Sequence, residues 1–323
     1  MSAPHGTWLT GFLGHCILVP LWTTAPFPLL GAIALLCKGQ LLAGAMLLGI
    51  LAVITFVKLP YQPWLVKMFY DLDLPRYYRR CEICGPHLGA LRKERTLYLF
   101  HPHGVLSAGF TINGCWGRAF NTLTAEKDLD PSRPRGTTFL IASNLREYGL
   151  LFKVLCDLSG RLESATKGNI MRLMRSGRNV AIIPGGFEDA TLHARGKHRT
   201  AMRQRKGLIK YALQHGYAIT PIYSFGESET YHTFTPLLRQ RLALNRYNIP
   251  GVLFFGWPWL PLLPDAQSEI RTFIGAPLEL PNLPEPTNAQ IDEWHGRYLE
   301  ALSALFDAHK AEAGVPHATL EIW

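Results

Sequence analysis

Two histidines flank a proline and precede a glycine in His101-Pro102-His103-Gly104, directly after the apolar run 96–100. Pro102 biases His101 toward an extended conformation, and Gly104 permits the turn that presents an imidazole at the carboxyl end of a strand. Open α/β sheets bind ligands at such ends. An imidazole titrates near neutral pH, which suits removal of a proton from a hydroxyl nucleophile. We therefore predict a general base here. The alternatives are core histidines or a metal pair, and no His-Glu-x-x-His partner supports a metal.

A second candidate site is Pro184-Gly185-Gly186-Phe187-Glu188-Asp189, which follows the apolar run 181–183. Gly185 and Gly186 allow backbone N–H groups to approach a ligand closely. Glu188 or Asp189 could orient a histidine and stabilise its charge, as a carboxylate does in hydrolytic triads. An ordinary turn is the alternative. We predict that Gly104, Gly185 and Gly186 form an oxyanion-binding turn and that Glu188 is the catalytic carboxylate, with Asp189 as its rival.

Basic residues are concentrated between positions 161 and 210. This stretch holds twelve Lys and Arg against three acidic residues, in a chain whose net charge is +9. Such a concentration indicates an anion site or contact with an acidic membrane surface. Nucleic acid is excluded as a partner because the region lacks interleaved aromatic residues. The basic residues are Arg161, Lys167, Arg172, Arg175, Arg178, Arg195, Lys197, Arg199, Arg203, Arg205, Lys206 and Lys210.

Several common motifs are missing from the sequence. It contains no Gly-x-x-x-x-Gly-Lys-Ser/Thr, no Gly-x-Gly-x-x-Gly and no Gly-x-Ser-x-Gly, the usual signs of nucleotide, dinucleotide and serine-hydrolase chemistry. Cys81-x-x-Cys84 with His87 lacks a second pair of ligands, so we predict reduced thiols and no metal. The remaining reaction uses a histidine base, an anionic co-substrate and an apolar one. Acyl transfer from a coenzyme A thioester to a lipid alcohol meets all three requirements.

The hydrophobic pattern predicts the elements that position these residues. Short buried strands are expected at 96–100, 137–142, 179–183, 218–223 and 271–274, and helices at 145–157, 169–176 and 204–215. An amphipathic helix is expected after Pro286-Thr287. Strands that alternate with helices predict an α/β fold with a mostly parallel sheet and flanking helices. The aromatic, proline-rich stretch 249–264 is either a core loop or a surface that enters the lipid interface.

The first 57 residues have the composition of a membrane segment, because Lys38 is their only formal charge. Residues 41–57 are an unbroken apolar run, and 12–37 form an apolar segment in which three prolines predict kinks. The short connection 38–40 predicts a hairpin that crosses the bilayer or re-enters it. We therefore expect a membrane hairpin at 1–60 and a single domain at 61–323. Eight basic against four acidic residues in 58–95 predict that this domain is cytosolic.

At these residues the sequence resembles the diacylglycerol O-acyltransferase type 2 family, which also includes monoacylglycerol and wax-alcohol acyltransferases. The resemblance covers nearly the whole chain. Its motifs are Tyr98-Leu99-Phe100-His101-Pro102-His103-Gly104, Arg205-Lys206-Gly207-Leu208-Ile209-Lys210, Pro221-Ile222-Tyr223-Ser224-Phe225-Gly226-Glu227, Phe273-Ile274-Gly275-Ala276-Pro277 and Pro286-Thr287.

The resemblance implies an enzyme of the endoplasmic reticulum membrane, with a cytosolic active site, that makes triacylglycerol from diacylglycerol and acyl-CoA without a cofactor and associates with lipid droplets. It implies that His103 is the catalytic base and that His101 supports it. Arg205, Lys206 and Lys210 are expected to bind the CoA phosphates. The motif residues Gly207, Ser224, Phe225, Gly226 and Glu227 receive no separate role.

Other readings stay open beside this one. The acceptor could instead be monoacylglycerol or a long-chain alcohol, the protein could be a non-catalytic lipid-droplet scaffold, and it could form a homo-oligomer. The wider glycerolipid acyltransferases use His-x-x-x-x-Asp, whereas the fifth residues after His101 and His103 are Leu106 and Ala108. A remote carboxylate is then needed. Those enzymes also hold an acceptor phosphate with an arginine where this chain has Phe187, so we expect a neutral acceptor.

Overall fold

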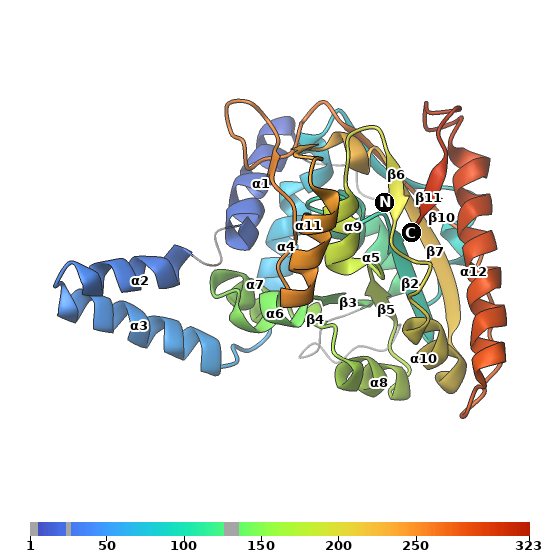
Figure 1. Ribbon diagram of the computed structural model, residues 1–323, viewed down its shortest axis with the longest axis horizontal. Coiled ribbons are helices and arrows are strands. Elements are labelled where there is room, and N and C mark those ends of the chain that lie inside the picture. Colours follow the sequence, from blue (N-terminus) through green and yellow to red (C-terminus); the bar gives the residue numbers. More distant parts are fainter. Residues whose placement is uncertain (1–5, 24–26, 126–135) are drawn as a thin grey trace.

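A seven-stranded sheet lies at the centre of the structure (Figure 1). The computed structural model describes residues 6–23, 27–125 and 136–323. The strand order is β1-β10-β7-β2-β5-β3-β4, and every pairing is parallel except β10 with β7. The predicted α/β fold with a mostly parallel sheet and flanking helices is therefore confirmed. The strands of this sheet are β1 (Arg80–Cys84), β2 (Thr96–His101), β3 (Thr138–Ile141), β4 (Leu162–Ser164), β5 (Val180–Ile182), β7 (Ala218–Phe225) and β10 (Glu269–Ile274).

Strand β2 is fully buried because both of its faces are covered. Leu97 and Leu99 contribute to one apolar core, and Tyr98 and Phe100 contribute to the other, as the two-residue repeat of a strand requires. The core around Leu97 includes residues of α8 (Lys167–Arg175), α10 (Gly207–His215) and α12 (Asn288–His309). The opposite core includes residues of α1 (Trp8–Thr23), α4 (Pro63–Leu72), α5 (Arg118–Thr124) and α7 (Leu151–Ser159). His101 has the parity of Leu99, so its side chain faces α12.

One prediction from periodicity is wrong, and strand β1 was not predicted. The single helix expected at 145–157 is wrong, because the chain forms α6 (Ser143–Tyr148) and α7 and breaks at Gly149 and Leu150, where Leu150 has φ of +40°. The sequence of β1 carries charged residues because it is an edge strand, paired only with β10 among the described strands.

Cys81 and Cys84 both lie in β1, and residues three apart in a strand face opposite sides.

Up to position 57, the described residues form a docked helix and a projecting hairpin, so the apolar segment predicted at 12–37 is divided between two helices. Helix α1 packs against the domain, and its His15 ring stacks on Tyr77 with centroids 4.2 Å apart. Helices α2 (Phe27–Cys37) and α3 (Leu41–Phe56) run antiparallel and extend away from the sheet (Figure 1). Within the described residues no single helix is both long and apolar enough to cross a membrane. Helices α1 and α2 satisfy that test together, bent by 59°.

The end of the hairpin is fastened to helix α7. The carboxylate of Asp157 accepts the N–H of Leu59 at 3.2 Å, and the ammonium of Lys153 donates to the carbonyl of Val57 at 3.0 Å. Asp157 is buried and also pairs with Lys153 and Arg146 at 2.7 and 2.6 Å. The exit of α3 is therefore held by buried ionic contacts, which fixes the base of the hairpin on the domain.

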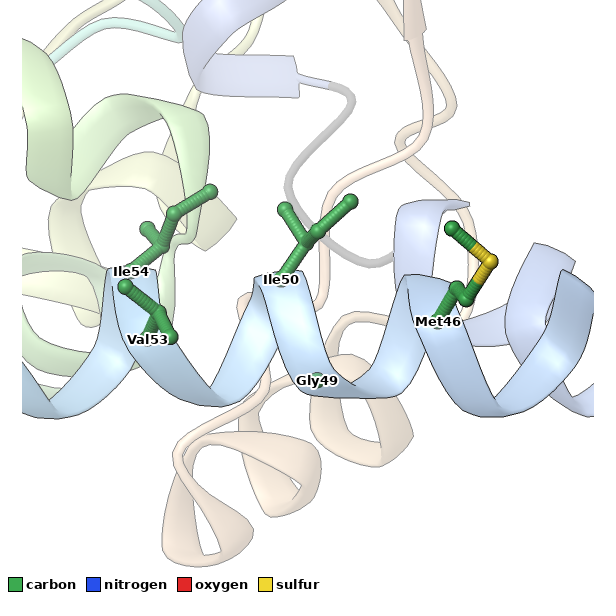
Figure 2. Close-up of a pocket in the computed structure, with 5 residues that line it drawn as sticks. All are labelled: Met46, Gly49, Ile50, Val53 and Ile54. Carbon is green, nitrogen blue, oxygen red and sulfur yellow. The ribbon is translucent and has the colours of Figure 1, made fainter.

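An open apolar recess of about 400 Å³ lies along helix α3. Figure 2 shows Met46, Ile50 and Ile54 projecting from the helix, with Gly49 and Val53 completing the lining. All five residues come from α3 and none carries a titratable group. The recess therefore belongs to the surface of the hairpin and offers no chemistry of its own.

Candidate functional site

His101 lies at the end of β2 and is completely buried. Its Nδ1 is 2.8 Å from the hydroxyl of Thr200, and its Nε2 is 2.7 Å from the hydroxyl of Tyr298 on α12. Burial lowers its pKa from 6.5 to about 3, so the ring is neutral. Because both ring nitrogens are engaged, His101 is a structural link between β2 and α12 and has no free nitrogen for a substrate.

The hydrogen bonds around His101 run in one direction. Thr200 donates its hydroxyl hydrogen to the Oδ2 of Asp189 at 3.2 Å. Thr200 must then accept from Nδ1–H of His101, which leaves Nε2 to accept from Tyr298, so each donor has one acceptor. Asp189 is the end of this chain and also accepts the backbone N–H groups of Ala201 and His103. A buried carboxylate thus fixes both the first histidine and the backbone of the second.

Asp189, and not Glu188, lies against the histidine loop. Both residues belong to α9 (Gly186–Leu192), where successive side chains point about 100° apart. Asp189 is buried, and burial raises its pKa from 3.8 to about 6. Glu188 points outward and pairs with Arg205 at 2.9 Å. A Cβ on Gly185 would meet the Asp189 carboxylate at 2.0 Å, so only glycine leaves room for this carboxylate.

His103 is half-buried and has one free ring nitrogen. Its Nδ1 lies 3.1 Å from the carbonyl oxygen of Gly104 and 3.1 Å from the hydroxyl of Ser107. A carbonyl only accepts, so Nδ1 carries the hydrogen and Nε2 carries the lone pair. Nε2 has no hydrogen-bond partner among the residues that the structure describes. Burial holds the pKa of His103 below 6.5. His103 is therefore a neutral imidazole whose basic nitrogen is available.

Glu227 supports the loop that follows His103. Its two carboxylate oxygens accept the N–H groups of Ala108 and Gly109 at 2.7 and 2.9 Å. Burial raises its pKa from 4.5 to about 7. Gly104 adopts φ of +62°, and a Cβ there would meet the Glu227 side chain at 2.5 Å. Glycine is required at position 104 on both counts, so the loop closes tightly over a buried carboxylate.

The C-terminal residues also reach the site. Strand β11 (Leu320–Ile322) pairs in parallel with β6 (His198–Thr200), and Trp323 donates its N–H to the carbonyl of Thr200 at 2.8 Å. Arg199 on β6 pairs with Glu321 at 2.9 Å. The end of the chain therefore helps to fix Thr200, which links His101 to Asp189.

The residues predicted to bind phosphate lie around the start of α10. Arg205 pairs with Glu188, and Lys206 pairs with Asp292 of α12 at 2.7 Å. Both pairs are exposed, and such surface pairs contribute at most about 1 kcal/mol, so an anionic ligand can exchange with the carboxylates. Lys210 is exposed on α10 and has no carboxylate partner among the described residues.

The other predicted residues take structural positions. Gly186 and Gly207 open helices α9 and α10. Ser224 in β7 is 3.0 Å from the hydroxyl of Thr272 in β10, and Phe225 is buried in the core. Gly226 follows with φ of +82° and leads into Glu227.

Three residues of the site were not predicted from the sequence: Thr200, Tyr298 and Ser107. Thr200 and Tyr298 are about 100 and 200 positions from His101, and no local pattern connects them. Ser107 is closer to being predictable. The His-x-x-x-x-Asp motif places an acid at the fifth position after a histidine. In this chain the residue that contacts the His103 ring is the fourth, Ser107, and it carries a hydroxyl.

Comparisons with known proteins agree on one family. The sequence profile described as diacylglycerol acyltransferase matches residues 89–322. The chain is 32% identical over 241 residues to human diacylglycerol O-acyltransferase 2-like protein 6, covering 69% of this chain and 68% of that protein. It is 32% identical over 247 residues to human diacylglycerol O-acyltransferase 2, covering 70% of this chain but only 59% of that protein.

Two further similarities extend the comparison. The chain is 29% identical over 236 residues to bovine 2-acylglycerol O-acyltransferase 1, covering 68% of this chain and 67% of that protein. The crystal structure of the 1-acyl-sn-glycerophosphate acyltransferase from Thermotoga maritima superposes with a TM-score of 0.45 at 11% identity. This superposition covers 93% of this chain and 95% of that chain.

Proposed function

Since the chain belongs to the diacylglycerol O-acyltransferase type 2 family, we propose that it transfers an acyl group from acyl-CoA to the free hydroxyl of diacylglycerol. The observation that carries this proposal is the state of His103. Its Nδ1 is held by Gly104 and Ser107, and its Nε2 has no hydrogen-bond partner in the described part of the chain. That arrangement suits a general base for a neutral hydroxyl.

The reaction is a direct transfer. Nε2 of His103 removes the acceptor hydroxyl proton while the oxygen attacks the thioester carbonyl carbon. The tetrahedral intermediate collapses, the C–S bond breaks, and the proton on Nε2 passes to the departing CoA thiolate. We assign binding of the developing oxyanion to backbone N–H groups of the turn at Gly104. Gly185 and Gly186, which precede Asp189 in the sequence, are assigned to the same role. No covalent intermediate on the protein is needed.

Ser107 and Asp189 act as positioning residues in this scheme. Ser107 contacts Nδ1 and so limits rotation of the His103 ring. In His-x-x-x-x-Asp enzymes the aspartate would have this role. Asp189 accepts the backbone N–H of His103 at 3.3 Å and anchors the His101 chain. Both contacts keep Nε2 aimed at one place, which matters because a misplacement of about 1 Å can cost about 100-fold in rate.

Acyl-CoA binding is assigned to Arg205, Lys206 and Lys210 at the start of α10. Arginine can hold a phosphate through two N–H groups, and lysine contributes a point charge. Lys210 is free among the described residues, and the other two cations are held only by surface carboxylates. A CoA phosphate can therefore replace Glu188 and Asp292 at little cost in free energy.

Membrane attachment through the α2–α3 hairpin completes the proposal. The hairpin projects from the domain, and both of its helices are apolar and without charged residues. We assign it to the membrane of the endoplasmic reticulum and to the lipid-droplet surface, with the domain on the cytosolic side. A diacylglycerol acceptor dissolves in such a membrane. The sequence predicts a membrane part at 1–60 and a domain at 61–323; we assign only the α2–α3 hairpin of that part to the membrane, because α1 packs against the domain.

The acceptor is tested by competition between alcohols. Microsomes from cells that lack neutral-lipid synthesis and express the chain are given radiolabelled oleoyl-CoA with diacylglycerol, monoacylglycerol or hexadecanol. We expect labelled triacylglycerol from diacylglycerol as the main product. A preference for either of the other alcohols would change the acceptor and keep the chemistry. Binding to droplets without consumption of oleoyl-CoA would support the scaffold instead.

A further inference from the structure

Exposed large apolar side chains are concentrated in two parts of the described chain. Among the described residues, every large apolar side chain that is exposed lies within 8–64 or 234–262, apart from Leu123, Leu151 and Trp323. Large exposed apolar patches on a protein mark sites of interaction. The first group lies on the hairpin and α1, apart from Trp64 at the start of α4. The second group lies in the domain itself and is not explained by the hairpin.

The second group belongs to a segment that we call the aromatic segment, residues 231–264. It includes β8 (His232–Thr233), α11 (Leu238–Leu244) and β9 (Phe254–Phe255). Trp259 is 84% exposed, Tyr247 is 75% exposed and Leu253 is 68% exposed. The full set of exposed large apolar residues is Phe234, Leu237, Leu244, Tyr247, Ile249, Leu253, Phe255, Trp259, Leu260 and Leu262.

The formally charged residues of the aromatic segment are all basic. It contains no Asp or Glu, whereas Arg239 and Arg246 are exposed on it. Trp and Tyr favour the boundary between water and lipid, where one end of the ring is apolar and the other is wet. Exposed arginines beside them suit the phosphates of lipid headgroups. Apolar and basic side chains without acidic ones are the composition of a surface that contacts a phospholipid membrane.

The aromatic segment adjoins the N-terminal apolar helices. Trp257 contacts Phe12 of α1 edge to face, with ring centroids 6.2 Å apart. The carbonyl of Asn248 accepts a hydrogen bond from Asn144 at 3.3 Å, close to the junction of α6 and α7 that packs on α3. Figure 1 shows α1, α11 and the orange loops together on the side of the domain opposite α12. The aromatic segment therefore contacts helix α1 at Trp257 and lies on the same side of the domain as that helix.

The aromatic segment is fastened to the helix that carries Asp189. The guanidinium of Arg241 is buried and donates to the carbonyls of Thr235, Pro236, Gly251 and, on α9, Thr191, all at 2.8 to 3.0 Å. Gly251 also donates its N–H to the hydroxyl of Thr191 at 3.1 Å. These hydrogen bonds join the segment to α9 and so fix the position of the apolar surface relative to the candidate site.

We propose that the aromatic segment is a second membrane-contacting surface, which seats the catalytic domain on the phospholipid bilayer that holds its acceptor. The choice of acceptor rests on the proposed function, but contact with lipid does not. The hairpin tethers the chain, and the aromatic segment orients the domain. Trp259, Leu253 and Tyr247 enter the interface, with Arg239 and Arg246 at the headgroups.

Photo-crosslinking in the full chain tests lipid contact directly. Trp259→benzoylphenylalanine and, as control, Glu300→benzoylphenylalanine on α12 are reconstituted into vesicles of phosphatidylcholine and phosphatidylserine that contain radiolabelled phosphatidylcholine. We expect labelled lipid on the first protein at roughly ten times or more the level of the second, since a side chain of this size strongly favours an apolar environment. Equal labelling, or a crosslink from position 259 to a second copy of the chain, would overturn the proposal.

An activity measurement separates orientation from chemistry. The double variant Leu253→Ser with Trp259→Ser is compared with Leu123→Ser, which changes an exposed leucine outside the aromatic segment. With diacylglycerol in vesicles we expect a loss of roughly tenfold for the double variant only. With a short-chain diacylglycerol dissolved as monomers we expect no loss. Equal losses in both assays would contradict the proposal. If the unaltered chain uses neither substrate, the proposed function fails while the crosslinking result still decides on lipid contact.

Discussion

Substitution of Gly104 by alanine is the most specific test of the geometry at the site. Gly104 has φ of +62°, and an added Cβ would lie 2.5 Å from Cγ and 2.7 Å from Oε1 of Glu227. Glu227 is buried beneath the loop and holds the N–H groups of Ala108 and Gly109. The methyl group therefore displaces Glu227 or the loop, and either movement shifts His103.

The size of the effect follows from these contacts. The left-handed backbone costs about 1–2 kcal/mol for alanine. Loss of two hydrogen bonds to a carboxylate costs about 1.5–3 kcal/mol each, and the lower entropy of the unfolded chain offsets about 0.4–1 kcal/mol. The net loss is at least about 3 kcal/mol, which for a chain of 323 residues lowers Tm by roughly 4 °C or more. A shift of His103 by about 1 Å lowers turnover by about 100-fold.

The assay pairs acyl transfer with a thermal melt of the purified protein. Gly296→Ala is the matched control, because Gly296 lies inside helix α12 and a Cβ there meets nothing within 4 Å. This control should retain full turnover and gain about 0.5–1 kcal/mol from better helix propensity. If Gly104→Ala kept the turnover and Tm of the unaltered chain, the assigned contact between Gly104 and Glu227 would be refuted.

Three further predictions follow from the site. Asp189→Asn should lower turnover by tenfold or more, because an amide that faces backbone N–H donors costs about 1–3 kcal/mol. Glu188→Gln should have little effect because it loses only a surface ion pair. Similar losses of turnover in both variants would contradict the assignment of Asp189. Turnover measured from pH 5 to 8 should fall on acidification with a midpoint below pH 6.5. The reason is that burial lowers the pKa of His103 and only its neutral form accepts a proton. A midpoint above pH 6.5 would argue against His103 as the base. Lys210→Gln should raise KM for acyl-CoA about threefold to tenfold at low salt with kcat unchanged, and an unchanged KM would remove Lys210 from the CoA site.

Local patterns sufficed for the central sheet. The run Leu97 to Phe100 is apolar on both faces, because β2 lies between two other strands and beneath two layers of helices. Its burial is therefore visible in the sequence. Strand β1 lies at the edge of the sheet and carries charges, so its pattern resembles that of a loop. Strands β6 and β11 have three residues each and pair across about 120 positions, and no local signal predicts such a pairing.

The candidate site was predictable only where it is local. His101, His103 and Gly104 follow a strand directly, and the position of that strand determines theirs. The hydrogen-bond chain from Tyr298 through His101 and Thr200 to Asp189 joins four distant elements and depends on tertiary packing. The choice between Glu188 and Asp189 depended on the direction in which α9 leaves β5, which the sequence does not specify.

The most direct test of the central claim is the turnover of His103→Gln. The variant is compared with His317→Gln, which changes an exposed histidine that makes none of the contacts described for the site. Radiolabelled oleoyl-CoA and diacylglycerol are supplied to both at matched protein levels. The assignment of His103 as general base predicts loss of triacylglycerol synthesis by about 100-fold or more in His103→Gln and full synthesis in His317→Gln. Undiminished synthesis in a folded His103→Gln protein would contradict it.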